Sequence, residues 1–230
     1  MSPSGTLGVL LRGERDFLVG VVERPETQKL LHSVLIIVMG AGLYGAAMGW
    51  WRAPLQALYV SIKFPLIMLL TAIGNSLLNA MLAPLLGLNM GLRQSFQAVL
   101  LSFSIAAAIL GSFSPLMAFF TWNAPPMGQA GSTYSFIMLL HVVAIAFAGV
   151  AGNWRLLQLL QHMSGNRSVA QRVFLAWLTG NFFLGSQLSW ILRPFIGSPG
   201  LDVDFLRKTA LQGNFYETVF HSFLNVLNIK

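Results

Sequence analysis

Long runs of apolar residues, separated by short polar breaks, dominate the sequence. A helix needs about 20 apolar residues to cross the hydrocarbon core of a bilayer. Five runs reach that length, at residues 30–50, 64–87, 96–120, 134–153 and 172–193. Because a chain in lipid must pair its own backbone groups, the pattern predicts an all-α fold, a polytopic membrane helix bundle of about five transmembrane helices.

Short interfacial helices are expected beside these spans. Residues 52–63 (RAPLQALYVSIK) are too few to cross a membrane, but Leu55, Leu58 and Ile62 repeat at helical spacing. The segment therefore predicts a short helix in the membrane surface. Pro65 follows it and is expected to kink or restart the chain at the start of the second span.

The breaks divide the chain into three parts. Residues 1–29 form a charged head outside the bilayer, 30–193 the five-span membrane domain, and 194–230 a C-terminal tail. In the tail, Asp202 is expected to cap a short helix that ends near Thr209, and residues 215–228 have the spacing of an amphipathic helix. Residues 121–133 contain four prolines and glycines and predict an irregular loop.

Composition and charge agree with a chain solvated by lipid. The chain is 55% hydrophobic and 9% charged, whereas soluble domains carry about 25% charged residues. The net charge is +7, but the basic residues lie singly or in pairs at the ends of apolar runs. They predict contact with the lipid bilayer and no nucleic-acid partner. Their distribution favours a cytoplasmic N-terminus, with 8 Lys and Arg on that side and 6 on the other.

The chemistry that the sequence lacks excludes several classes of membrane protein. All seven acidic residues lie outside the predicted spans, and the chain has no cysteine. Cation-coupled transporters usually carry a carboxylate at membrane depth, and intramembrane metalloproteases need an H-E-x-x-H helix. We therefore predict no catalytic residue, no metal site and no cofactor.

Five polar side chains are nevertheless expected inside the spans: Asn75, Asn79, His141, Asn181 and Gln187. A buried amide is costly unless it is paired, so these groups should meet one another or a backbone carbonyl. One interpretation is an intramembrane polar network that locks the bundle. The other is a polar path for a small neutral solute or a lipid headgroup. His141 lacks a second ligand nearby in sequence, and a haem or metal at this residue is the less favoured alternative.

Three residues have the character of interface anchors. Lys63 and Arg193 each stand at a span end beside a proline, and Trp190 lies three residues before Arg193. Long cationic side chains at such positions reach the lipid headgroups, and tryptophan lies at the same level. An alternative for Arg193 is an ion pair with Asp202 or Asp204, which would fold the tail back onto the membrane face.

A ladder of small residues on the first span predicts close helix packing. Ala41, Gly45 and Gly49 stand four residues apart on one face. Small residues let helix backbones approach closely in lipid. The ladder indicates either tight packing within one bundle or self-association through the first span.

Several short motifs together resemble a family of uncharacterised bacterial multi-pass membrane proteins. The resemblance covers residues 40–200 and rests on GLYGAAMG (42–49), LQALYVSIKFPL (55–66), LLGL (85–88), SFQAVL (95–100), SPLMAFF (114–120) and GSQLSWILRPFIGSPG (185–200). The layout also resembles the Yip1-like superfamily, whose members organise membranes and bind partners. Some members of the first family carry an actin-binding WH2 label. Residues 206–209 (LRKT) resemble its core, but four residues are too few to predict actin binding.

These features lead to two functional hypotheses. The first is a non-enzymatic subunit, scaffold or organiser of a membrane complex in the bacterial inner membrane. Its partners would be other membrane subunits or further copies of the chain. The alternative is a permease or channel for a small neutral or lipidic substrate, which would use the polar residues inside the spans.

Overall fold

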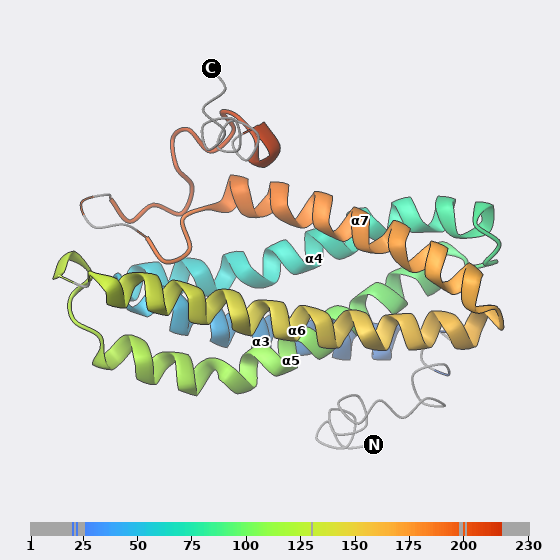
Figure 1. Cartoon of the computed structure of the whole chain (residues 1–230), viewed down its shortest axis with the longest axis horizontal. Helices are drawn as coiled ribbons and strands as arrows, with labels where there is room; N and C mark the ends of the chain where they lie inside the picture. Colours follow the sequence, from blue (N-terminus) through green and yellow to red (C-terminus); the bar gives the residue numbers. More distant parts are fainter. Residues whose placement is uncertain are drawn as a thin grey trace.

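The computed structural model describes residues 20, 22, 26–129, 131–197, 200 and 202–217. It contains five long helices, labelled in Figure 1: α3 (Thr27–Trp50), α4 (Pro54–Leu85), α5 (Leu92–Asn123), α6 (Ser132–Ser164) and α7 (Arg167–Leu192). A short 3₁₀ helix, Met127–Gln129, lies between α5 and α6. The described residues contain no strand. Most of the predicted head and the amphipathic tail helix beyond residue 217 lie outside the described residues.

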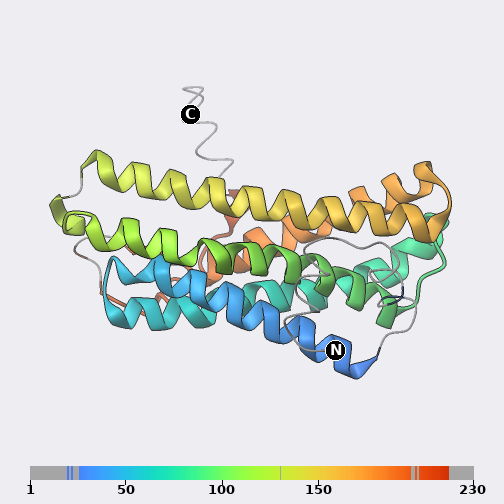
Figure 2. The same ribbon diagram turned by 90° about the horizontal axis from the view of Figure 1, so that it is seen from below.

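The helices form a bundle, and α3 lies between α4 and α5. It packs against both α4 and α5, while α6 packs on α5 and α7 packs on α4. Figure 2 shows α3 alongside these two neighbours, with α6 on the far side of α5. The buried apolar residues form two clusters between these helices.

Four of the described helices are long and apolar enough to cross a membrane, namely α3, α4, α5 and α6. The chain is thus an all-helical protein of the integral membrane type. The predicted fifth span corresponds to α7, which is fully formed as a helix but is not among these four. Its Arg172, Asn181 and Gln187 make it more polar than the others. A count of five transmembrane helices stays a prediction.

One boundary prediction is wrong. Residues 52–63 do not form a separate interfacial helix, because α4 runs without a break from Pro54 to Leu85. Pro65 lies inside this helix, where it cannot donate a hydrogen bond to the carbonyl of Ser61. A proline is tolerated there because neighbouring helices support a transmembrane helix. Gly42 of α3 is such a neighbour, since a Cβ on it would lie 3.3 Å from the Ser61 carbonyl oxygen.

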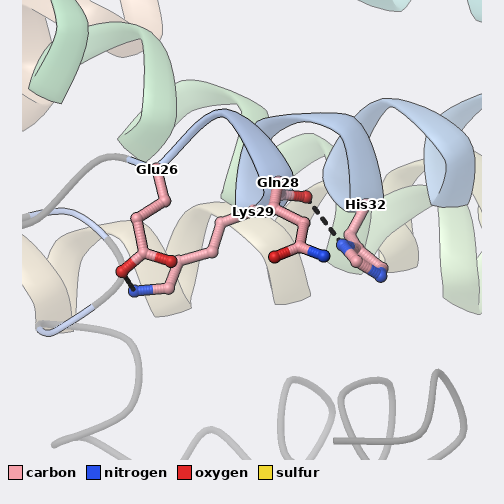
Figure 3. A network of polar contacts seen from close by, with 4 residues as sticks. All are labelled: Glu26, Gln28, Lys29 and His32. Carbon is pink, nitrogen blue, oxygen red and sulfur yellow. Dashed lines mark hydrogen bonds and ion pairs between the residues drawn. The ribbon is translucent and has the colours of Figure 1, made fainter.

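Polar side chains mark the start of α3, as Figure 3 shows. Lys29 Nζ lies 3.1 Å from Glu26 Oε1, and His32 Nδ1 donates to the Gln28 carbonyl at 2.6 Å. Glu26 stands immediately before the first helical residue. Its negative charge lies next to the positive end of the helix dipole, so it favours the start of α3 at this point.

The small-residue ladder of α3 faces the rest of the same chain. Ala41, Gly45 and Gly49 are all buried. A Cβ on Gly45 would lie 2.5 Å from the Val60 carbonyl oxygen, and one on Gly49 would lie 2.6 Å from that of Gln56. The backbones of α3 and α4 are therefore in direct contact along this face, and α4 already occupies it.

Gly165 and Asn166 form the turn between α6 and α7. Gly165 adopts the left-handed conformation with φ 60°, which glycine tolerates without a steric penalty. Asn166 then caps α7, and its side chain accepts hydrogen bonds from the amides of Ser168 and Val169. The two helices are thereby fixed as an antiparallel hairpin.

Aromatic residues mark two levels along the bundle. Tyr134 and Trp154 of α6 are 20 residues apart, a rise of about 30 Å, which equals the thickness of a typical hydrocarbon core. The ring of Tyr134 lies 5.7 Å from that of Trp51, and Trp50 lies 6.1 Å from Trp122. Aromatic rings gather in this way where helices leave the hydrocarbon.

The tail differs from its predicted form. Asp202 does not cap a helix, because residues 202–213 form a loop with bends and turns. A helical turn begins at Phe215. The tail instead follows the bundle, with the ring of Phe205 against Tyr59 and that of Tyr216 stacked on Phe183.

We predict that Gly45→Ala lowers the free energy of unfolding by about 1–3 kcal/mol, because the new methyl group would overlap the Val60 carbonyl. Gly149→Ala is the matched control. It makes the same change inside a helix, and nothing lies within 4 Å of the added Cβ. Unfolding in detergent by titration with SDS would measure both. Equal losses for the two variants would contradict the close contact.

Candidate functional site

A cleft of about 600 Å³ lies between α4, α5, α6 and α7. Helices α6 and α7 meet at their hairpin turn and diverge toward the opposite end of the bundle (Figure 1). The lining of the cleft includes α6 from Tyr134 to Asn153 and, on α7, Asn181, Gly185 and Ser189. Cavities that hold small molecules in proteins usually measure about 300–1,000 Å³.

The cleft is long and mostly apolar. Tyr134 and Asn153 are 19 residues apart on α6, which corresponds to about 28 Å. Its walls are apolar on two helices, with Phe64, Ile67 and Met68 on α4 and Phe103 and Leu110 on α5. Among the described residues of the lining, Arg207 is the only one with a charged side chain.

His141 is buried in the wall of the cleft. Its side chain is 2% exposed, and its Nδ1 lies 2.9 Å from the hydroxyl of Tyr44 on α3. The two rings meet edge to face at 5.5 Å. The other ring nitrogen, Nε2, is buried and has no hydrogen-bond partner in the described part of the chain. Tyr44 holds the imidazole in place, and protein atoms cover Nε2.

Two further polar atoms of the cleft are buried without a partner. These are the hydroxyl of Thr71 and the side-chain oxygen of Asn153. The amide nitrogen of Asn153 donates to the Gly149 carbonyl at 2.9 Å. Hydroxyls in helices commonly bond to the carbonyl four residues back, as Thr179 does with Leu175 here. The Thr71 hydroxyl makes no such bond.

The predicted polar network divides into separate groups. Asn75 and Asn181 do meet, since the Asn75 amide donates to the Asn181 oxygen at 2.6 Å and to the Trp177 carbonyl at 3.1 Å. These bonds join α4 to α7. Asn181 also lines the cleft, whereas Asn75 does not.

The other predicted members of the network lie elsewhere. Asn79 is fully buried, and neither of its amide atoms has a partner among the described residues. Gln187 accepts a hydrogen bond from the backbone amide of Phe215 in the tail. His141 bonds to Tyr44 rather than to an amide. The five residues therefore do not form one continuous path.

The predicted interface anchor Lys63 has a different environment from the one expected. Its side chain is 0% exposed, and its ammonium group donates to the carbonyls of Pro194 at 3.1 Å and Asp204 at 3.5 Å. It also lies 5.2 Å from the ring centre of Phe205. Lys63 thus contacts the tail, because the chain folds back over α4 after Arg193 and covers it.

Gln56 joins the same contact. Its amide donates to the carbonyls of Pro194 and Phe195 at 3.0 and 2.8 Å. The hydroxyl of Tyr134 donates to the Gly197 carbonyl at 3.3 Å. Residues 194–197 are held in this way across one end of the cleft, and Pro194, Phe195, Ile196 and Gly197 belong to its lining.

Trp190 and Arg193 form a pair at the end of α7. The guanidinium carbon of Arg193 lies 3.4 Å from the ring centre of Trp190, and its Nη1 donates to the Trp190 carbonyl at 2.9 Å. No ion pair joins Arg193 to Asp202 or Asp204, all three of which the structure describes. The expected alternative partner of Arg193 is therefore wrong, since its cation lies over the indole ring.

Sequence reasoning missed Tyr44, Thr71 and Gln56. For Tyr44 a signal existed, because a tyrosine in mid-span requires a partner for its hydroxyl. The predicted surface helix at residues 52–63 does not indicate that Gln56 is a buried donor. Nothing in the sequence distinguishes Thr71 from other hydroxyl residues in the spans.

Comparisons of the chain with protein-family models, with curated proteins and with solved structures found no match. Neither the resemblance to bacterial multi-pass proteins nor the Yip1-like layout is tested by them. Within the described residues, no group of three potential metal-ligating side chains gathers.

We predict that Lys63→Met releases the tail from α4. The change keeps the length of the side chain but removes the donor to the Pro194 and Asp204 carbonyls, a loss of about 1.5–3 kcal/mol for bonds to a charged group. The chain has no cysteine, so a spin label on Leu211→Cys would report the mobility of the tail without background. Leu211 is 80% exposed.

The matched control for this change is Lys29→Met, which removes a lysine from the far end of the bundle, where it pairs with Glu26. It should leave the label unchanged. A tail that is equally immobile in both variants would show that Lys63 does not hold it.

Proposed function

We propose that the chain binds a lipidic molecule in the cleft between α4, α5, α6 and α7, as a permease or carrier for a lipidic substrate would. The observation that carries this proposal is a long, mostly apolar cleft of about 600 Å³ that α4, α5 and α6, three helices long and apolar enough to cross a membrane, form together with α7. An apolar cleft of this size fits the hydrocarbon part of a small molecule.

The depth of the cleft supports a ligand that comes from the membrane. Its α6 residues lie between Tyr134 and Asn153, which is the interval between the two aromatic levels of that helix. A molecule in the cleft would therefore lie at the depth of the acyl chains. Arg207 at one end offers a cation at the level where lipid headgroups lie.

The mostly apolar walls of the cleft argue against an aqueous channel. The amide nitrogen of Asn75 donates to Asn181 and to a backbone carbonyl and so joins α4 to α7, and Asn75 does not line the cleft. Of the two substrate classes in the permease hypothesis, this favours the lipidic one over the small neutral one.

The role of a non-enzymatic subunit or scaffold stays a prediction. It rests on charge-poor spans, on small-residue packing faces and on two helices outside the membrane, the head and the amphipathic tail helix, which lie largely outside the described residues. We also keep the bacterial inner membrane, with the N-terminus in the cytoplasm, as the proposed location. It rests on the distribution of basic residues, with 8 on the N-terminal side and 6 on the other.

We predict that Gly149→Phe abolishes the retention of lipid by the purified protein. Gly149 lines the cleft, and nothing lies within 4 Å of a Cβ added to it, so the new ring would occupy the cleft without displacing the backbone. Native mass spectrometry after incubation with vesicles of phosphatidylglycerol and phosphatidylethanolamine would count the lipids retained by each chain.

The matched control is Val150→Phe, one residue further along α6. Val150 is 69% exposed and does not line the cleft. We expect it to retain at least one lipid per chain, like the unmodified protein, and Gly149→Phe to retain none at this site. Equal retention by both variants would overturn the proposed function.

A further inference from the structure

Positive charges gather where the tail closes one end of the cleft. Residues 194–197 and Arg207 belong to the lining at this end, together with Tyr134. The tail reaches this position because the chain turns back after α7, at the end of the bundle opposite the α6–α7 hairpin (Figure 1). The rings of Tyr134 and Trp51 meet here at 5.7 Å, so this end of the cleft lies at the aromatic level where lipid headgroups are found.

Arg207 carries donors that the protein does not use. Its side chain is half-buried, and its guanidinium makes no hydrogen bond or ion pair with the described residues. Its side-chain nitrogens are not among the buried, unpartnered atoms of the described chain, so they are accessible to a ligand. The neighbouring cations differ in this respect, because Lys63 donates to two tail carbonyls and Arg193 lies over the Trp190 ring.

The charge of Arg207 acts on two other cations. Burial and the charge of Arg207 lower the pKa of the Arg193 guanidinium, so these two side chains repel each other. Arg207 also repels the ammonium group of Lys63, and Asp204 offsets part of that repulsion. Like charges held together in a partly buried place are stabilised by an anion that binds between them and the solvent.

The charge balance at this end of the cleft stays positive when the other charged residues are included. Arg52 lies here too, since the nearest atom to a Cβ added on Gly197 is its Cγ, at 3.0 Å. Asp202 and Asp204 are the two acidic residues of the segment 202–213, and neither forms an ion pair with Arg207 among the described residues. The cations therefore outnumber the carboxylates.

An accessible arginine at the end of an apolar cleft selects among lipids by the charge of the headgroup. The guanidinium presents its N–H groups as a planar fork, which binds two oxygens of a phosphate or carboxylate at once. A zwitterionic headgroup would bring its own cation beside Arg193 and Lys63, which repel it. An anionic headgroup brings no such cation.

We infer that the tail end of the cleft binds the anionic headgroup of a lipid, with the guanidinium of Arg207 paired to phosphate or carboxylate oxygens. The acyl chain would lie along the apolar walls of α4 and α5. This inference rests on the proposed function, because it names the class of lipid for the same cleft.

The experiment is a competition between lipids that have the same acyl chains. The full chain in detergent would be incubated with equal amounts of palmitoyl-oleoyl phosphatidylglycerol, which is anionic, and palmitoyl-oleoyl phosphatidylcholine, which has the same phosphate but a positive choline. Native mass spectrometry would give the ratio of the two lipids retained. A parallel incubation with palmitate and the same phosphatidylcholine distinguishes a carboxylate from a phosphate as the bound anion.

We expect the unmodified protein to retain an anionic lipid in preference to phosphatidylcholine. Arg207→Gln should lower this preference about tenfold, which corresponds to about 1.4 kcal/mol. Arg207→Lys keeps the charge without the planar fork and should retain part of the preference.

Lys208→Gln is the matched control. It removes a positive charge from the next residue of the tail, which is exposed and does not line the cleft. The preference should be unchanged in this variant. An equal loss in Arg207→Gln and Lys208→Gln would indicate attraction of lipids to the charged surface as a whole, and it would overturn the inference.

Two further outcomes separate the inference from the function on which it rests. Lipid retention that Gly149→Phe abolishes, but that favours neither anionic lipid over phosphatidylcholine, would leave the proposed function standing and overturn the role of Arg207. This comparison uses the unmodified tail, so it holds even where an Arg207 variant does not fold. Retention that Gly149→Phe leaves unchanged would overturn the cleft as a lipid site, and the inference with it.

Discussion

Direct contact between helix backbones is the interaction on which the rest of this bundle depends. Lipid tails are as apolar as leucine, so the helices gain little from hiding their apolar faces from them. The contact of Gly45 with the Val60 carbonyl and of Gly40 with the Ala107 carbonyl brings α3 against α4 and α5. Because glycine has no Cβ atom, the helix backbones can approach each other closely at these two positions. The three helices form a base on which α6 and α7 then lie.

The same reasoning explains why the cleft lies where it does. Gly152 fixes α6 on α5, since a Cβ there would lie 2.6 Å from the Ser102 carbonyl oxygen. Helix α7 is held in another way, by the hairpin at Gly165, by the Asn75–Asn181 pair and by the tail. These attachments lie at its ends and near its middle rather than along one continuous face. Between them α6 and α7 are separated by the cleft, where polar atoms remain without partners.

Much of the fold follows from the sequence because apolar runs and turn residues report directly on helices in lipid. The five apolar runs predict the locations of all five long helices. The break before Pro65 was wrong, because a proline inside a helix costs less when Gly42 packs beside it. Lys63 was misplaced for a related reason. Its sequence position resembles a span end, but only the course of the tail determines that Pro194 covers it. The cleft has no sequence signature, since it arises from the divergence of two helices.

The tail contacts both the buried donors of α4 and the end of the cleft. Lys63 and Gln56 of α4 use their donors on the carbonyls of Pro194 and Phe195, so residues 194–197 are fixed across the end of the cleft without any side-chain charge of their own. Arg207 follows on the same segment and brings a cation to that end. Two buried donors that the sequence assigned to the membrane surface therefore complete the cleft. An apolar residue in place of Lys63 or Gln56 would leave helix α4 intact. It would remove the hydrogen bonds that hold residues 194–197 at the end of the cleft.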